Sequence, residues 1–257
     1  PLYPKLPLLD IKNTWVYIRV EDFLVLIVLL WWCSLFVRQK VSLKTPLTIP
    51  VFLFWIIGAV ATIHGMLLIF PSLSGVYTNV SFLSFLRRIE YMSVFFIAYS
   101  AMKDRGSITP VIMTVSGTVL LVSLYGLGQK FIGLPAYLTM NEEFAKGTPL
   151  LLSSLSRISS TFAGHYDLAA YYVLVLPIIA SLIFGYSNWL VRIVLTGILA
   201  LGTVVLFMTV SRISFFALVF SLAVVLFFQR RKVILMLLPV LFIAGILFLT
   251  LAPQLAD

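Results

Sequence analysis

Four arginines stand beside apolar segments where hydrophobicity alone would not place them: Arg87, Arg88, Arg157 and Arg212. A guanidinium group binds phosphate through paired hydrogen bonds, and an arginine at membrane depth usually faces the protein interior or a watery cavity. Each of the four could instead extend to lipid headgroups. If all four face one outward cavity beside Ser211, they would bind a lipid-linked pyrophosphate. They would also stabilise the negative charge that the pyrophosphate gains as it leaves the transferred group. We therefore predict these five residues as a substrate-binding set.

Transfer to a hydroxyl group also needs a base or a residue that orients the acceptor, and His165, Glu90 and Asp167 are the candidates. An unperturbed imidazole titrates near neutrality, although His165 could equally be a helix-entry residue that bonds backbone or headgroups. Asp167 also fits the N-cap of the helix that follows it. Glu90 lies three residues after Arg87, and this spacing predicts an ion pair between them.

The sequence contains no phosphate-binding glycine loop, no dinucleotide fingerprint and no Asp-x-Asp pair, so we predict neither a cofactor nor a metal. Cys33 is the single cysteine and lies in an apolar run, which leaves no disulfide framework. The net charge of +9 comes from basic residues scattered between apolar segments, a pattern that sets membrane topology and does not indicate nucleic-acid binding.

The elements that must position these residues are membrane helices. Hydrophobic residues make up 61% of the chain and charged residues 11%, against roughly 25% charged in soluble domains. Long charge-free runs predict an all-α, polytopic transmembrane bundle, because helices satisfy every backbone group within one segment. We expect one transmembrane domain over 1–257 with an outer loop at 129–166. The predicted helices are 21–38, 47–70, 82–101, 107–128, 167–186, 189–209, 213–228 and 233–252.

The distribution of basic residues predicts the orientation of these helices. Eight spans place the connections near residues 40, 104, 189 and 230 on one side, and these short segments hold nine Lys and Arg residues. The other side holds nine as well, spread over longer segments and mixed with most of the acidic residues. Because basic residues in short loops govern insertion, we place the short connections in the cytoplasm and the four arginines at the outer face.

Three motifs carry a resemblance to a known family. They are Arg157-Ile-Ser-Ser-Thr-Phe162 with the Leu168-Ala-Ala-Tyr171 run and a Pro-containing helix, Arg88-Ile-Glu-Tyr91, and Thr209-Val-Ser-Arg-Ile-Ser214. Their order and membrane context resemble the O-antigen ligase and O-antigen polymerase (Wzy-type) family of bacterial membrane glycosyltransferases. The run His165-Tyr-Asp167 departs from the Asn- or Pro-containing version common in that family.

The resemblance implies transfer of a glycan from an undecaprenyl-pyrophosphate-linked donor to a lipid or glycan acceptor, on the outer face of the cytoplasmic membrane. Such an enzyme serves surface-polysaccharide or lipopolysaccharide biosynthesis in the cell envelope. The family also carries a large outer loop with residues important for catalysis, often including a histidine. We expect that loop, and further helices, to lie outside this chain, whose first residue is Pro1 and whose last is Asp257.

Two other classes of protein fit parts of this pattern. A transporter or flippase of lipid-linked saccharides would also use membrane arginines for an anionic substrate. It would more often show repeated halves and broken helices around a midplane site, whereas the charges here gather toward one face. A purely structural membrane scaffold would explain the hydrophobicity but not the charges near Ser211 and Glu90.

Overall fold

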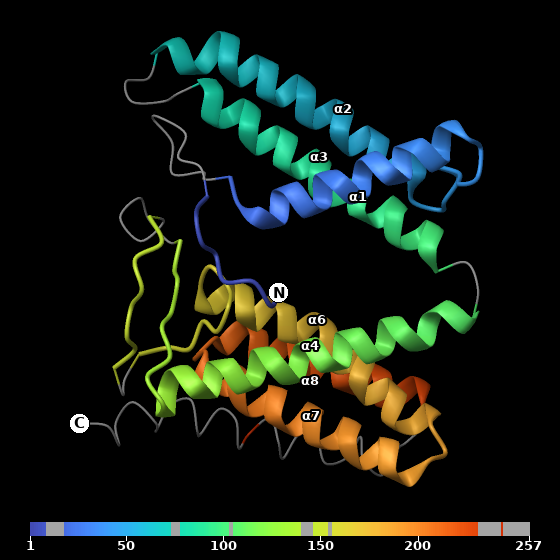
Figure 1. Cartoon of the computed structure of the whole chain (residues 1–257), viewed down its shortest axis with the longest axis vertical. Helices are drawn as coiled ribbons and strands as arrows, with labels where there is room; N and C mark the ends of the chain where they lie inside the picture. Colours follow the sequence, from blue (N-terminus) through green and yellow to red (C-terminus); the bar gives the residue numbers. More distant parts are fainter. Residues whose placement is uncertain are drawn as a thin grey trace. The chain divides into compact units, whose positions relative to one another are not determined.

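The computed structural model describes residues 1–8, 18–72, 78–102, 105–139, 146–153, 156–230 and 243. Their contacts divide the chain into two compact units, which are taken one at a time below. Residues 7–110 make the first unit, and residues 1–6 with 111–257 make the second. Both units are drawn in Figure 1, where the helices keep the labels used here.

The first unit contains α1 (Val20–Val37), α2 (Thr48–His64) and α3 (Thr78–Ala101). A π-helical turn (Gly65–Ile69) and a short 3-10 turn (Phe70–Ser72) extend α2. Helix α3 contacts both other helices. Phe96 of α3 is buried between the rings of Phe52 and Trp55 on α2, while Trp32 of α1 donates a hydrogen bond of 3.1 Å to Ser100 Oγ of α3.

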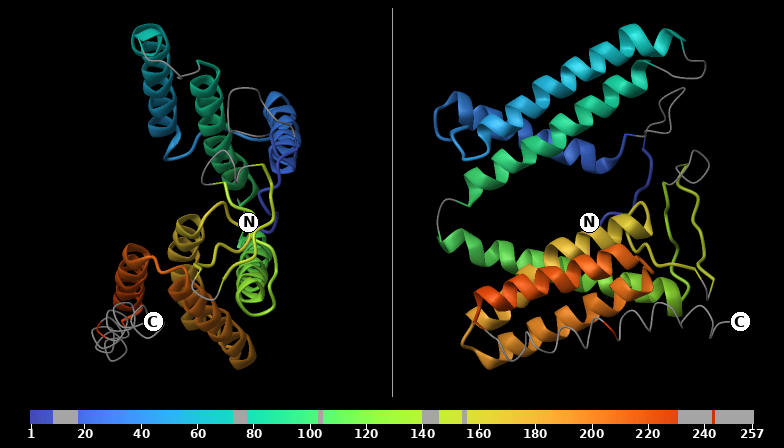
Figure 2. Two further views of the ribbon diagram at one scale, coloured as in Figure 1. Left: turned by 90° about the vertical axis from the view of Figure 1, so that its left-hand side faces the viewer. Right: turned by 180° about the vertical axis from the view of Figure 1, so that it is seen from behind.

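The second unit contains most of α4 (Arg105–Phe131), with α6 (His165–Gly185), α7 (Trp189–Met208) and α8 (Arg212–Phe228). Helix α6 packs against both α7 and α8, and α7 lies so close that a Cβ at Gly202 would be 2.7 Å from Leu176. The Tyr172 hydroxyl of α6 and the Ser123 hydroxyl of α4 are both fully buried and lie 2.8 Å apart. The core of this unit therefore joins helices far apart in the sequence. Both views in Figure 2 show the ribbons of these helices side by side.

The all-helical membrane fold predicted from the sequence is confirmed. Within the described residues, five helices are long and apolar enough to cross a membrane, namely 20–37, 48–69, 108–131, 165–185 and 189–208. Large apolar side chains such as Val37, Ile57 and Ile213 remain exposed on the helix surfaces, as expected for side chains that face lipid. The chain is a multi-pass membrane protein.

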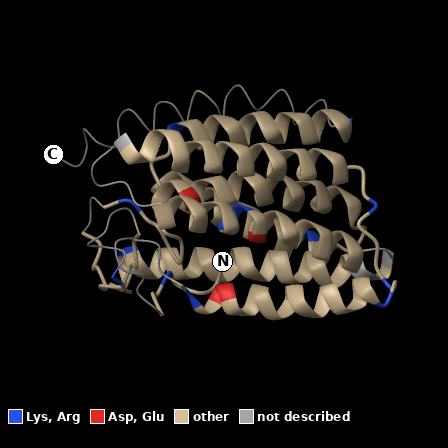
Figure 3. Ribbon diagram, turned by 90° about the horizontal axis from the view of Figure 1, so that it is seen from above, with Lys and Arg blue, Asp and Glu red and all other residues tan. Residues whose placement is uncertain are grey.

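The span count of eight differs from what the structure describes. Helix α8 is apolar but shorter, with 17 residues, and α3 is not among the five long apolar spans because charged residues interrupt it. The predicted eighth helix, 233–252, lies outside the described residues except for Ile243. Within the part of the chain that the structure describes, charged residues gather at helix ends and in connections, and some lie inside helices (Figure 3).

The predicted outer loop begins later than expected, because α4 continues to Phe131. Beyond it, Ala136 and Leu150 exchange two backbone hydrogen bonds of 2.7 and 2.9 Å and so pair two extended segments. Gly133 and Gly147 flank this pair with φ near +78° and +79°, a conformation that glycine adopts without a steric penalty. The end of the loop then turns back onto the helices of the second unit.

Candidate functional site

The segment that carries Arg157 is fixed to the end of α4 by one buried side chain. The Gln129 carboxamide donates to the Ser160 carbonyl at 2.9 Å and accepts from the Ser160 amide at 2.8 Å. It also donates to the Pro135 carbonyl at 3.1 Å. Gln129 and Ser160 are essentially inaccessible to solvent, so these bonds replace the water that both backbone groups would otherwise need.

Further bonds hold the same segment against α4 and α7. The Ser160 hydroxyl donates to the Val122 carbonyl at 2.7 Å, and Lys130 Nζ donates to the Ser156 carbonyl at 3.0 Å. The Ile158 amide donates to the Met208 carbonyl at the end of α7, at 3.3 Å. The run 156–161 is therefore held by two helices, although it contains no regular secondary structure.

A small residue in α4 allows this close approach. A Cβ at Gly126 would lie 3.0 Å from Ile158 Cγ2 and 3.4 Å from Val205 Cγ1, so a larger side chain would push the segment outward. Ser160 adopts a φ of 51°, which is strained for a residue other than glycine and persists only where neighbours enforce it. The bonds from Gln129 to both backbone groups of Ser160 supply that constraint.

Arg157 and His165, both predicted site residues, are brought together by this arrangement. Arg157 Nη1 lies 3.0 Å from His165 Nε2, and Arg157 is exposed. Because arginine carries only donors, Nε2 must be the acceptor, and the proton of the neutral ring is on Nδ1. In this arrangement the lone pair that a general base would use is already occupied by the arginine.

The other predicted residues of the second unit are Asp167, which follows His165 in α6, and Ser211 and Arg212, which lie at the start of α8. Helix α6 begins at His165 with Gly164 as its N-cap, so the predicted capping role of Asp167 is wrong. Asp167 is instead an exposed residue of the first turn, where its charge complements the helix dipole. The Ile158–Met208 bond places the Arg157 segment beside the turn that joins α7 to α8.

That turn carries the predicted residues Ser211 and Arg212. Val210 has a φ of 56°, and Ser211 is the N-cap of α8, with its hydroxyl 2.8 Å from that of Ser214. Ser211 is buried, whereas Arg212 is exposed at the first position of the helix. A positive charge at a helix N-terminus is opposed by the dipole, so Arg212 would gain from an anion bound there.

Arg87, Arg88 and Glu90 belong to the first unit. Helix α3 begins at Thr78 rather than at residue 82, so these charges stand about two and a half to three turns inside it rather than in its first turns. The predicted Arg87–Glu90 ion pair is wrong, because Arg87 pairs with Asp22 of α1 at 3.0 Å. Arg88 is exposed on the surface of α3.

Sequence reasoning missed the residues that hold the site in place. Gln129 and Lys130 were assigned to the start of a loop, whereas they form the last turn of α4. Two adjacent polar residues at the end of a long apolar helix are the sequence feature that could have indicated a contact with the following loop. Asp22 lies at the start of the predicted helix 21–38, and nothing in the local sequence indicates a partner 65 residues away.

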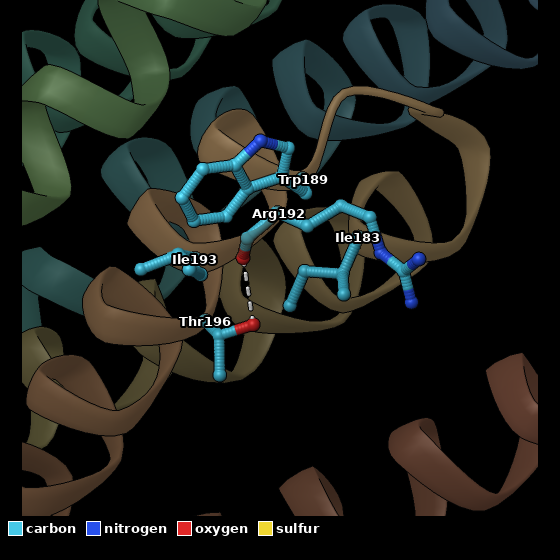
Figure 4. A pocket seen from close by; sticks show the side chains of 5 residues that line it. All are labelled: Ile183, Trp189, Arg192, Ile193 and Thr196. Atoms are coloured by element: carbon cyan, nitrogen blue, oxygen red, sulfur yellow. Dashed lines mark hydrogen bonds between the residues drawn. The ribbon is translucent and has the colours of Figure 1, made fainter.

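A separate pocket of about 360 Å³ lies where α6 meets α7, lined by Ile183, Trp189, Arg192, Ile193 and Thr196. Figure 4 shows the Arg192 guanidinium extending past Ile183, away from the Trp189 ring, while the Thr196 hydroxyl bonds to the Arg192 carbonyl. No predicted site residue lines this pocket. Over the described ranges, no three His, Cys, Asp or Glu side chains gather as metal ligands would.

No family model matches the chain, and no curated protein or solved structure matches it either. The family resemblance therefore rests on the sequence motifs alone.

Proposed function

We propose that this protein transfers a glycan from a polyprenyl-pyrophosphate-linked donor to an acceptor hydroxyl, at the outer face of a bacterial cytoplasmic membrane. The observation that carries the proposal is the exposed Arg157 guanidinium, presented by a segment that Gln129 and Lys130 fix to α4. A preorganised cation suits a pyrophosphate that gains charge as it leaves. The order of the three sequence motifs adds the glycosyltransferase resemblance.

The reaction assigned to the protein exchanges one C–O bond for another and moves one proton. The acceptor oxygen attacks the anomeric carbon of the glycan, and the bond from that carbon to the pyrophosphate oxygen breaks. The electron pair of that bond leaves with the polyprenyl pyrophosphate, and the hydroxyl proton passes to a base. No outside energy source is needed, because the donor is already activated.

The Arg157–His165 contact suggests how binding and proton transfer are linked in this proposal. While Arg157 donates to Nε2, His165 cannot accept a proton there. A pyrophosphate is a stronger partner for the guanidinium than a neutral imidazole, since both of its hydrogen bonds would then be charge-assisted at each end. Donor binding would draw Arg157 away and leave Nε2 able to accept the acceptor proton.

The activity is tested with the protein that carries this chain and the outer loop expected beyond it, reconstituted in liposomes with an undecaprenyl-pyrophosphate-linked glycan and membrane-extracted acceptors. A new glycosidic linkage, detected by mass spectrometry, is expected for the wild type and for Arg192→Ala. Arg157→Ala should lower the rate at least tenfold, with Arg157→Lys in between. Equal rates in all four proteins would remove Arg157 from the mechanism, and redistribution of the donor between leaflets without a new linkage would indicate a transporter.

A further inference from the structure

An apolar hollow within the first unit lies between α1 and α3. It has a volume of about 460 Å³, within the range of roughly 300–1,000 Å³ typical of ligand sites. Apolar side chains form most of its wall: Ile18, Phe23, Leu26, Leu29, Leu83, Leu86 and Ile89. Phe23, Leu26 and Leu86 are also exposed, so the groove is accessible from the surface of this unit.

Three ionisable side chains complete the lining, namely Asp22, Arg87 and Glu90. Two of them satisfy each other, because Arg87 Nη2 donates to Asp22 Oδ2 at 3.0 Å. The neighbouring acid Glu21 does not line the groove and pairs with Arg19 at 3.3 Å. The carboxyl group left over is that of Glu90.

Glu90 is the unusual member of this group. Its Oε1 atom is buried and has no hydrogen-bond partner among the residues that the structure describes. A buried polar oxygen without a partner costs about 1–3 kcal/mol, and more when it carries a charge. A groove with apolar walls and an unsatisfied carboxyl oxygen is complementary to an apolar chain that carries a hydrogen-bond donor, and a positive charge would suit it best.

We propose that the α1–α3 groove binds a membrane lipid whose head is a primary ammonium group, of the phosphatidylethanolamine class. One acyl chain would lie along the leucine-rich wall. The Glu90 carboxylate would turn to present its buried Oε1 atom, and the ammonium would donate to that atom and balance the charge. The ionised Asp22, Arg87 and Glu90 side chains sum to one negative charge, which opposes a lipid of net negative charge but not a zwitterionic one. A quaternary ammonium head has no N–H to donate and would leave Oε1 unsatisfied.

This inference goes beyond the proposed glycan transfer and does not depend on it, because its readout is lipid binding. The purified chain is exchanged into detergent with equal amounts of phosphatidylethanolamine, phosphatidylcholine and phosphatidylglycerol, and retained lipids are counted by native mass spectrometry. We expect at least a fivefold preference for phosphatidylethanolamine. Glu90→Gln should abolish the preference, and Leu26→Trp, which fills the groove, should lower retention of all three lipids.

Glu21→Gln is the matched control, since it makes the same acid-to-amide change on a residue outside the groove. It should leave the preference unchanged. Circular dichroism and size-exclusion chromatography show whether each variant is folded. If Glu90→Gln does not fold, lipid retention by Leu26→Trp tests whether the groove is the binding site. Retention without preference in the wild type, preference unchanged in Glu90→Gln, or unchanged retention in Leu26→Trp would each overturn the proposal.

Discussion

Replacing Gln129 by leucine tests whether one side chain holds the Arg157 segment. The substitution places an apolar side chain of similar size in the last turn of α4 and removes all three hydrogen bonds of the carboxamide. Pro135 keeps the Tyr125 hydroxyl as a donor at 2.8 Å. The amide and carbonyl of Ser160, in contrast, lose the partner that satisfies both.

The expected magnitude follows from these two groups. Each buried backbone group left unsatisfied costs about 1–3 kcal/mol, so local opening of the segment should become easier by about 2–4 kcal/mol once relaxation is allowed for. The strained φ of 51° at Ser160 also favours opening of the segment. Among the described residues, no group other than the Gln129 carboxamide bonds both the amide and the carbonyl of Ser160. Since 1.4 kcal/mol is a factor of ten, amide exchange should speed up roughly 30- to 1,000-fold.

Hydrogen–deuterium exchange of peptides covering 156–162 measures this effect directly. Gln229→Leu is the control, because the Gln229 side chain, at the end of α8, makes one exposed hydrogen bond of 3.4 Å among the described residues, to Ser181 of α6. The control should leave the 156–162 peptides unchanged, and helical content should be the same in all three proteins. Exchange within threefold of wild type in Gln129→Leu would refute the claim that Gln129 fixes this segment.

Two further predictions concern the core that supports the site. Gly202→Ala should destabilise the second unit by about 1–3 kcal/mol, because its Cβ would lie 2.7 Å from Leu176, whereas Gly197→Ala, with no atom within 4 Å, should be neutral or stabilising. Thermal unfolding in the same detergent compares them, and equal midpoints would contradict the packing seen at Gly202. Tyr172→Phe and Ser123→Ala should each lower stability by about 1 kcal/mol, with a double variant less affected than their sum. Strict additivity would show that these two hydroxyls do not bond to each other.

The helices could be predicted closely from the sequence because a segment that crosses lipid must be a long apolar run with its backbone hydrogen bonds satisfied within the helix. Runs of apolar residues between charges predicted α1, α6, α7 and α8 to within about two residues at each end. Helix ends set by tertiary contacts were less predictable. Helix α4 continues through Gln129 and Lys130 because the returning loop gives both polar side chains a bonding partner.

The candidate site was harder to predict, because its bonds join residues distant in the sequence. Helix spacing predicted the pair Arg87–Glu90, but Asp22 on α1 offers Arg87 a carboxylate at 3.0 Å and takes the place of the local partner. The motif 157–162 covers part of the candidate site, since two of its residues, Arg157 and Ser160, make the contacts described above. Gln129 lies 31 residues earlier than Ser160, and no local pattern links the two.

The binding of undecaprenyl pyrophosphate to the purified chain tests most directly whether the Arg157 guanidinium is a pyrophosphate site. Titration in detergent, followed by intrinsic tryptophan fluorescence, gives dissociation constants for the wild type, Arg157→Lys, Arg157→Ala and Arg192→Ala. Loss of charged hydrogen bonds worth about 1.5–3 kcal/mol predicts affinity weakened roughly 10- to 150-fold in Arg157→Ala. Arg192→Ala, which removes an exposed arginine close to the start of α7, should bind like the wild type. Equal affinities for Arg157→Ala and the wild type would contradict the account.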